Sequence, residues 1–243
     1  MDAQVRPFNA LLSRLPEAES ESLAPMLEPM SVRRGDVICQ PGGFIDFVQF
    51  PLTAVAAVAV PMADGAQPTV AIVGHEGLVG LPALLGQMRS PPRYVSWCVS
   101  GSAVRIRSED LLAAALPFGQ LVRMLSAYAE IRLTGVAQNA ACSGLHDVRA
   151  RCARTLLTLS DAADTDRLDF SHESLAMMLG VSRQSVSLAL ASLRVDRKIS
   201  YAAGRIVIID RGGLEGASCE CYAIVRERFD AFLKPPSTAL RND

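Results

Sequence analysis

Short apolar runs separated by turn residues dominate the chain from about Met30 to Arg107. Strands are expected at residues 37–39, 44–50, 55–60, 70–73, 94–99 and 103–106. Glycine- and proline-containing turns such as Pro41-Gly42-Gly43 separate these runs. Several short strands at this spacing predict a small all-β roll, sandwich or barrel rather than an α/β sheet. Helices are expected at 15–28, 78–85 and 108–115.

A helical period begins after Pro117 and continues to about residue 143. Apolar residues recur every 3.5 to 3.6 positions, which is typical of a helix with one buried seam. At 1.5 Å per residue such a helix is about 40 Å long, too long for one small domain to cover. We therefore expect it to pair with a second copy of itself. The residues expected in that contact are Leu121, Leu125, Tyr128, Arg132 and Val136. Ser143-Gly144 is expected to end the helix, followed by a helix at 146–159 and a polar loop at 160–169.

The segment from Ser171 to Tyr201 has the pattern of a helix-turn-helix. Ser171 is expected to cap a first helix and Gly180 to supply the positive φ of a tight turn. Ser182 is expected to cap a second helix over 182–195. The predicted buried positions of that helix are Val186, Ala189, Leu190 and Leu193.

The opposite face of this second helix carries Arg183, Gln184 and Ser187. Arginine pairs with guanine, glutamine with adenine, and serine with either a base or a phosphate. The segment is therefore predicted to bind DNA through a recognition helix in the major groove. A β-hairpin over 199–209 is expected to form a wing. The residues predicted to contact DNA are Ser171, His172, Ser182, Arg183, Gln184, Ser187, Lys198 and Arg205, with His172, Lys198 and Arg205 assigned to phosphates.

Charge and composition agree with this division of the chain. The 243 residues are 50% hydrophobic and 20% charged, which is a globular composition, and the net charge is −1. Residues 171–213 hold six basic and three acidic residues, so the basic surface is local. The fold class is predicted as α+β. The predicted divisions are an N-terminal β-roll at 1–116, a dimerisation helix at 117–143, a winged helix-turn-helix at 144–213 and a C-terminal tail at 214–243.

This arrangement resembles the Crp/Fnr superfamily of bacterial transcription regulators. The strings that carry the resemblance are Phe50-Pro51, 73–80 (VGHEGLVG), 175–183 (LAMMLGVSR) and 219–222 (CECY). The resemblance implies a roll similar to a cyclic-nucleotide-binding domain, a homodimer, and Arg183 and Gln184 at base-reading positions. Leu188 stands where many relatives carry another polar side chain. RNA polymerase is implied as a further partner.

The effector is not identified by the resemblance. Relatives that sense cyclic nucleotides use a Gly-Glu pair and an arginine followed by small residues, whereas here Leu81 follows Gly80 and Tyr94 follows Arg93. Gly80, Leu81 and Arg93 mark the expected effector pocket, and cyclic AMP is not expected in it. Relatives with an iron-sulfur cluster carry cysteines near the N-terminus, whereas the first cysteine here is Cys39, so no such cluster is expected.

The motifs for phosphate, metal or heme binding and for catalysis are incomplete in the sequence. The glycines at 74, 77 and 80 lack the spacing and the lysine of a phosphate loop, and are expected to serve turns and close packing. Cys219-x-Cys221 resembles half of a metal site, but the sequence shows no neighbouring ligands to complete it, so neither a metal nor a cofactor is predicted. Heme ligation by His75 or a cysteine is kept as a minor alternative. No serine, histidine and aspartate arrangement is apparent, and no enzyme is expected.

We therefore expect a cytoplasmic homodimer that binds a palindromic operator and is modulated through the roll. No export signal or membrane-spanning segment is apparent in the sequence. Two alternatives stay open. One is a sensor or interaction protein whose roll binds a ligand or partner and whose winged helix is only a docking surface, and the other is an activator that depends on a cyclic nucleotide.

Overall fold

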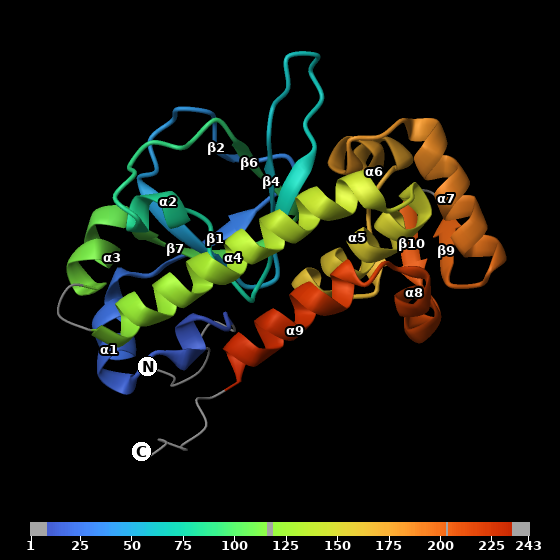
Figure 1. The fold of residues 1–243 in the computed structure, drawn as a ribbon. Helices are drawn as coiled ribbons and strands as arrows, with labels where there is room; N and C mark the ends of the chain where they lie inside the picture. Colours follow the sequence, from blue (N-terminus) through green and yellow to red (C-terminus); the bar gives the residue numbers. More distant parts are fainter. Residues whose placement is uncertain (1–8, 116–118, 203, 235–243) are drawn as a thin grey trace.

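The structure, a computed structural model, describes residues 9–115, 119–202 and 204–234. Two β-sheets form one end of the molecule, a long helix runs away from them, and a helical domain with a small sheet forms the other end (Figure 1). This confirms the α+β class and the order of roll, long helix and helix-turn-helix. The boundary expected at residues 116–117 and the turn residue 203 lie outside the described residues.

The roll consists of two antiparallel sheets that share a core. One sheet has the order β1-β7-β3 and the other β2-β6-β4-β5. The strands are β1 (Glu28–Val32), β2 (Val37–Cys39), β3 (Phe47–Pro51), β4 (Val55–Ala59), β5 (Thr69–Val73), β6 (Tyr94–Val99) and β7 (Gly101–Arg107). Val32 and Ala103 of the first sheet pack in one buried cluster with Ala56 and Trp97 of the second. The sheets therefore face each other across an apolar layer.

The helices around the roll are shorter than predicted at two places. They are η1 (Leu12–Arg14), α1 (Glu17–Leu23), η2 (Ala24–Met26), α2 (Leu81–Leu84) and α3 (Ser108–Ala115). The helix expected over 78–85 forms only at Leu81–Leu84, because Val79 is bridged to Gln49 and Gly80 adopts φ 107°. The helix expected over 15–28 is wrong beyond Leu23, because Pro25 lies in a 3-10 turn and the chain then enters β1. Strand β1 pairs with β7 from Glu28 opposite Arg105 to Val32 opposite Gly101. Its ladder partner lies far away in the sequence.

Helix α4 (Gly119–Leu145) is covered along one face by the same chain. Near its start, Leu121, Leu125 and Tyr128 are buried at 3%, 8% and 0% exposure in a cluster with the roll. The Tyr128 hydroxyl accepts a hydrogen bond from the Leu78 backbone N–H at 3.1 Å. Further along, helix α9 (Cys221–Leu233) lies beside α4 (Figure 1). Phe232 lies 6.4 Å from the Tyr128 ring, and Phe229 lies under the Arg132 guanidinium at 5.9 Å.

These contacts correct the predicted dimer seam at four of its five residues, while the fifth, Val136, is 37% exposed. Leu121, Leu125 and Tyr128 belong to the core of one protomer, so they are not available to a second copy. Arg132 faces inward too, and donates a hydrogen bond to the Ile72 carbonyl at 2.9 Å. The sequence pattern indicated a buried seam correctly. Its partners, however, are the roll and α9, a helix within the segment 214–243 that was expected to be a tail.

The junction after α4 also differs from expectation. Helix α4 continues through Ser143-Gly144 to Leu145, because an isolated glycine only weakens a helix by about 1 kcal/mol. Asp147 then caps α5 (Val148–Ala163) by accepting a hydrogen bond from the Ala150 N–H at 2.8 Å. Helix α5 therefore includes the first four residues of the loop expected at 160–169.

The C-terminal domain contains α5, β8 (Arg167–Leu168), α6 (His172–Leu179), α7 (Arg183–Val195), β9 (Ile199–Ala202), β10 (Arg205–Ile208) and α8 (Arg211–Ala217). Its core packs directly on the roll, since Val55 belongs to the same buried cluster as Leu156 and Leu190. Two glycines of the 74–80 loop lie where the roll approaches the helices, Gly74 against α5 and Gly77 against α4. A Cβ on Gly74 would lie 2.2 Å from the Ala162 carbonyl oxygen, and one on Gly77 would lie 2.2 Å from the Tyr128 hydroxyl. Close packing therefore accounts for both glycines.

No single helix in the described part of the chain is long and apolar enough to cross a membrane. Helices α3 and α4 reach that length and apolarity only as a pair, and they are bent by 119° from one another.

Candidate nucleic-acid interface

Helices α6 and α7 form the helix-turn-helix through three local devices. Ser171 Oγ caps α6 by accepting a hydrogen bond from the Ser174 N–H at 3.1 Å. Gly180 adopts φ 64° at the C-terminus of α6, where the Val181 N–H donates back to the Ala176 carbonyl. Ser182 Oγ then caps α7 through the Ser185 N–H at 3.1 Å. The predicted roles of Ser171, Gly180 and Ser182 in the fold are confirmed.

Helix α7 has one buried and one exposed face. Its buried residues, each at most 4% exposed, are Val186, Ala189, Leu190 and Leu193. They pack in one core with α5 and α6. On the other side Arg183 has 72% of its side chain exposed, Gln184 is exposed, and Leu188 is 67% exposed. Packing thus fixes which side chains α7 presents outward.

The Arg183 guanidinium is weakly held in the free protein. Its nearest acidic partner is Glu173, at 3.9 Å between Nε and Oε2, and both side chains are largely exposed. Exposed ion pairs of this kind contribute about 0 to 1 kcal/mol. A guanine base or a phosphate can therefore displace Glu173 at little cost.

His172 is placed differently from the prediction. Its Nδ1 lies 2.7 Å from Ser187 Oγ, its Nε2 is buried, and its ring lies 4.6 Å from the ring of Tyr201. Burial, with a further contribution from the Arg183 charge, lowers the pKa of His172. The expected phosphate contact is therefore contradicted: the imidazole joins α6, α7 and the wing from inside. Ser187 is half-buried, and its hydroxyl also donates to the Arg183 carbonyl at 2.9 Å.

The wing is a hairpin of β9 and β10 that β8 extends to three strands. Arg205 pairs with Ala202 and Ile208 with Ile199, and Gly204 in the turn adopts φ 79°. Strand β8 has only two residues, too few for a recognisable sequence pattern, and pairs with β10. The hairpin was predicted correctly.

The two predicted phosphate contacts on the wing have different surroundings. Arg205 donates from Nε to Asp169 Oδ1 at 2.8 Å, and this partner raises the pKa of Arg205. A phosphate would have to replace that carboxylate. Lys198 is half-buried, and its backbone connects the end of α7 to the residues after β10 through bonds to Leu193 and Ile209.

Two further exposed arginines lie at the end of the recognition helix. Arg194 is in the last turn of α7, and Arg197 follows it with φ 54°. Neither of them was predicted from the sequence to contact DNA. The signal that could have indicated them is the basic run from Arg194 to Lys198.

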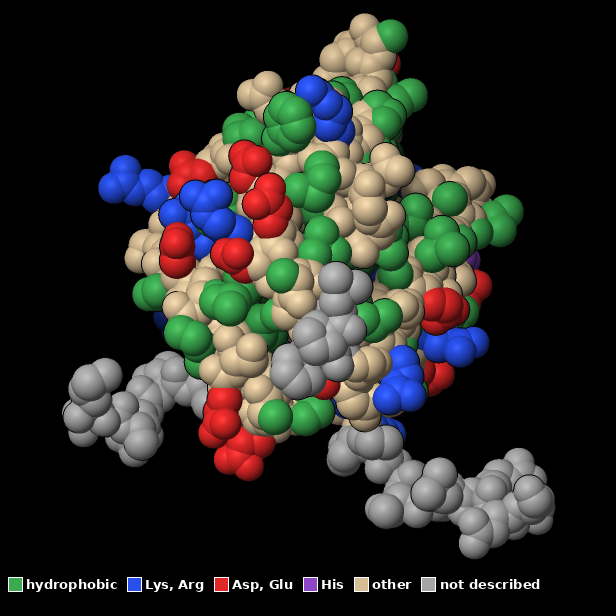
Figure 2. Space-filling model, turned by 90° about the vertical axis from the view of Figure 1, so that its left-hand side faces the viewer, with side chains coloured by type: hydrophobic (Ala, Val, Ile, Leu, Met, Phe, Trp, Pro, Cys, Tyr) green, Lys and Arg blue, Asp and Glu red, His purple; other side chains and the backbone are tan. Residues whose placement is uncertain are grey.

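The opposite end of the molecule has a different surface. Figure 2 shows Lys and Arg side chains next to Asp and Glu side chains on the roll end, with hydrophobic side chains between them. Mixed charge of this kind gives little attraction for a polyanion, whereas the wing end carries the excess of basic residues.

Arginines of α5 fix the position of the helix-turn-helix. Arg149 donates to Ser192 Oγ at 3.0 Å and to Asp196 Oδ2 at 2.6 Å, near the end of α7. Arg151 donates to the Leu179 carbonyl at the end of α6. The recognition helix is therefore held to α5, whose other end contacts the roll at Ala162.

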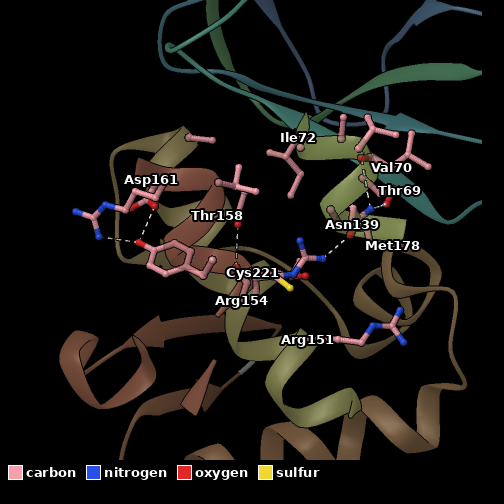
Figure 3. A pocket seen from close by; sticks show the side chains of 18 of the residues that line it. Thr69, Val70, Ile72, Asn139, Arg151, Arg154, Thr158, Asp161, Met178 and Cys221 are labelled. Carbon is pink, nitrogen blue, oxygen red and sulfur yellow. Dashed lines mark hydrogen bonds between the residues drawn. The ribbon is translucent and has the colours of Figure 1, made fainter. Parts of the chain in front are cut away.

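A cavity of about 1080 Å³ lies between the roll and the C-terminal domain. Strand β5 and helices α4, α5 and α9 line it (Figure 3). Asn139 lies in its wall and donates to the Thr69 carbonyl at 3.1 Å, while Arg154 donates to Asn139 Oδ1 at 2.5 Å. Gly80, Leu81 and Arg93, which were expected to form the effector pocket, do not line this cavity. Their assignment stays a prediction.

The structure also brings together residues that the sequence left apart. Cys142 Sγ lies 3.5 Å from Cys219 Sγ, and His146 Nδ1 lies 3.6 Å from Cys221 Sγ. Cys219-x-Cys221 therefore has two neighbouring ligands that were not expected from the sequence. Cys142 lies in the last turn of α4 and His146 directly follows that helix, and their i and i+4 spacing was the signal that could have indicated them.

Comparison with known proteins gives a match to one family model. Residues 150–217 match the model of a Crp-like helix-turn-helix domain. A search of curated protein sequences found no match to the chain.

Solved structures share the fold over most of their length. FixK2 from Bradyrhizobium japonicum superposes with a TM-score of 0.67 at 20% identity, over 79% of this chain and 98% of that one. A CRP/FNR-family transcriptional regulator from Thermus thermophilus gives 0.64 at 23%, over 79% and 98%. The c-di-GMP responsive regulator CLP from Xanthomonas campestris gives 0.64 at 17%, over 79% and 99%. At these identities the likeness establishes the fold.

Proposed function

The chain carries a Crp-like helix-turn-helix domain within the fold of the Crp/Fnr regulators, and from this premise we propose that it regulates transcription by binding a palindromic operator as a homodimer. The observation that carries the proposal is the outer face of α7. Arg183 and Gln184 stand exposed on a helix whose other face is fully packed. A helix fixed by packing on its other face can hold such side chains in register with base edges.

The proposed contacts divide into two kinds. Arg183, Gln184 and Ser187 would reach base edges in the major groove. Lys198 and Arg205, with Arg194 and Arg197, would neutralise phosphates, together with the capped N-termini at Ser171 and Ser182. Leu188, between the readers, would make an apolar contact such as that to a thymine methyl group. His172 is excluded from these contacts and instead supports Ser187.

The proposed dimer uses the side of α4 that α9 and the roll leave uncovered. The exposed residues along it are Val122, Ser126, Leu133, Ala137, Ala140 and Gly144, at intervals of three, four or seven. Leu133 is 70% exposed, which is unusual for leucine in a covered helix. This spacing and the small side chains suit close packing against a second copy of α4. Two recognition helices would then enter major grooves about 34 Å apart.

Regulation would pass from the roll to the DNA-binding domain through the 74–80 loop. Gly74 touches Ala162 of α5, His75 Nδ1 lies 3.4 Å from the Ala162 carbonyl, and Leu78 is bonded to Tyr128 of α4. A ligand that shifts this loop would change the angle between α4 and α5. RNA polymerase and a cytoplasmic location belong to the same proposal, as does an effector other than cyclic AMP.

The experiment that tests the proposal is selection from a random DNA duplex pool, followed by binding titrations at several salt concentrations. We expect a symmetric site. Arg183→Ala should weaken binding to it by about 1–3 kcal/mol and relax preference at one base pair, whereas Lys198→Ala should lower the salt slope by about one.

The matched control is Arg33→Ala, which removes an exposed arginine from the roll and should leave binding unchanged. Equal binding by Arg183→Ala and the parent would contradict the groove assignment. If no salt-sensitive DNA binding occurs, with or without cell extract, the alternative of a sensor with a protein-docking winged helix is favoured.

A further inference from the structure

Four soft ligands converge where the long helix meets the C-terminal domain. Cys142 lies in the last turn of α4 and His146 directly follows that helix. Cys219 lies between α8 and α9, and Cys221 is the first residue of α9. One ligand atom from each of the four residues lies within 4.8 Å of all the others. We propose that these residues bind one zinc ion in a tetrahedral Cys₃His site.

The spacing of the ligand atoms fits a single ion. With Zn–S bonds of about 2.3 Å and a Zn–N bond of about 2.0–2.1 Å, tetrahedral angles place two sulfurs about 3.8 Å apart and a sulfur and a nitrogen about 3.6 Å apart. The sulfurs of Cys142 and Cys219 are 3.5 Å apart, and Cys221 Sγ and His146 Nδ1 are 3.6 Å apart. The ligands thus already surround a space of the right size.

Two neighbouring side chains, Glu220 and Gln138, contact the ligands in ways that favour metal binding. Glu220 Oε2 lies 3.2 Å from His146 Nε2, so the carboxylate holds the proton on Nε2 and leaves Nδ1 directed at the sulfurs. Carboxylate partners of this type are the usual support of a metal-bound histidine. Gln138 Nε2 donates to Cys221 Sγ at 3.1 Å, a contact that suits a thiolate.

Ligand type and burial select the metal. The set contains three thiols and one imidazole and no carboxylate, which favours zinc over magnesium or calcium. The three cysteines are buried and the histidine is half-buried, so the four protein ligands leave no open position for a substrate. A disulfide needs sulfurs about 2.05 Å apart, and the three cysteines of the site are free thiols. The site is therefore structural rather than catalytic.

The proposed zinc site lies at the junction of α4, α5 and α9, so a bound ion would connect these helices. One ligand pair belongs to the end of α4, next to the Asp147 cap that starts α5, and the other pair holds the start of α9. A bound ion would join α9 to α4 and fix the junction between the long helix and the DNA-binding domain. This role does not depend on whether the protein binds DNA.

The test measures metal content on the full-length protein purified without added chelator. Inductively coupled plasma mass spectrometry should find about one zinc per chain, and Cys142→Ser, His146→Gln, Cys219→Ser and Cys221→Ser should each lower this content several-fold. Cys39→Ser is the matched control, because Cys39 lies in β2 of the roll, and it should retain the zinc.

A second measurement uses only the wild-type protein, so it does not depend on whether the variants fold. The wild-type chain, stripped of metal and reloaded with Co²⁺, should show thiolate-to-cobalt charge-transfer absorption and the intense d–d bands of a tetrahedral site. Reloading should saturate at one equivalent. Wild-type protein that neither contains zinc nor binds Co²⁺ overturns the proposal, and so does a Cys142–Cys219 disulfide found by mass spectrometry in protein prepared without reductant.

Discussion

Helices α4 and α7 are each buried on one face and exposed on the other, but their covering partners come from very different distances in the sequence. Helix α7 is covered by α5 and α6, which immediately precede it. Helix α4 is covered by the roll and by α9, so Tyr128 contacts both Leu78 and Phe232. The same periodic pattern therefore marks a face that is covered by neighbouring segments in α7 and by segments distant in the sequence in α4.

This difference shows what a periodic pattern can indicate. Periodicity reveals that a face is buried, but not which segment buries it. For α7 the neighbouring sequence supplies only one compact arrangement. For α4 the sequence indicated a second copy of the chain as the partner, whereas the segment after residue 214 was expected to be a tail. The structure places α9 on the patterned face and leaves a second, less apolar face open.

Leu193→Ala should have the largest effect on stability, because it empties the local core under α7. Leu193 is 0% exposed, and a buried leucine replaced by alanine costs about 2–5 kcal/mol. Chemical denaturation followed by circular dichroism measures the loss. A change below about 0.5 kcal/mol would show that this core is less tightly packed than the structure has it.

Tyr128→Phe should destabilise the distant packing of α4 by a smaller amount. The change removes the hydroxyl that accepts from the buried Leu78 N–H, and an unsatisfied buried donor costs about 1–3 kcal/mol. The same denaturation experiment measures it. Tyr201→Phe, on the half-exposed wing, is the control, and an equal loss in both variants would argue against a specific role for the Tyr128 hydroxyl.

Leu133→Glu should change the folding of one chain by no more than about 0.5 kcal/mol, because the side chain is 70% exposed. On the proposed dimer it places a charge in the apolar contact, so sedimentation should show monomers where the parent is a dimer. Leu85→Glu, at 61% exposure on the roll, should leave the mass unchanged. A Leu133→Glu protein that stays dimeric would move the interface elsewhere.

His172 should give the smallest effect, and it should depend on pH. Burial and Arg183 lower the pKa of His172 in the folded protein below its ordinary value of 6.5. The unfolded chain therefore binds a proton more readily, and folding loses stability as the pH falls below about 6.5. The stability of His172→Asn should fall less than that of the parent when the pH is lowered from about 7.5 to about 5.5. Parallel stability curves would show that His172 does not contribute to the acid sensitivity.

The sequence determined those features whose partners lie nearby in the chain. The caps at Ser171 and Ser182, the turn at Gly180, the buried face of α7 and the β9–β10 hairpin follow from residue type and short spacing, because each is completed within about one or two helical turns or one strand pair. The exposed Arg183 and Gln184 follow from the same periodicity. DNA binding is proposed from the match to the Crp-like helix-turn-helix model, and the duplex selection experiment tests it.

Only the tertiary structure decided the features that join distant segments. It turned His172 toward Tyr201, packed four of the five predicted seam residues of α4 against the roll and α9, and brought Cys142 and His146 to the distant Cys219 and Cys221. The physical reason is that a side chain's spacing fixes its direction from its own helix. Which surface it meets depends on how the whole chain buries its apolar area, and that total is not encoded in any single segment.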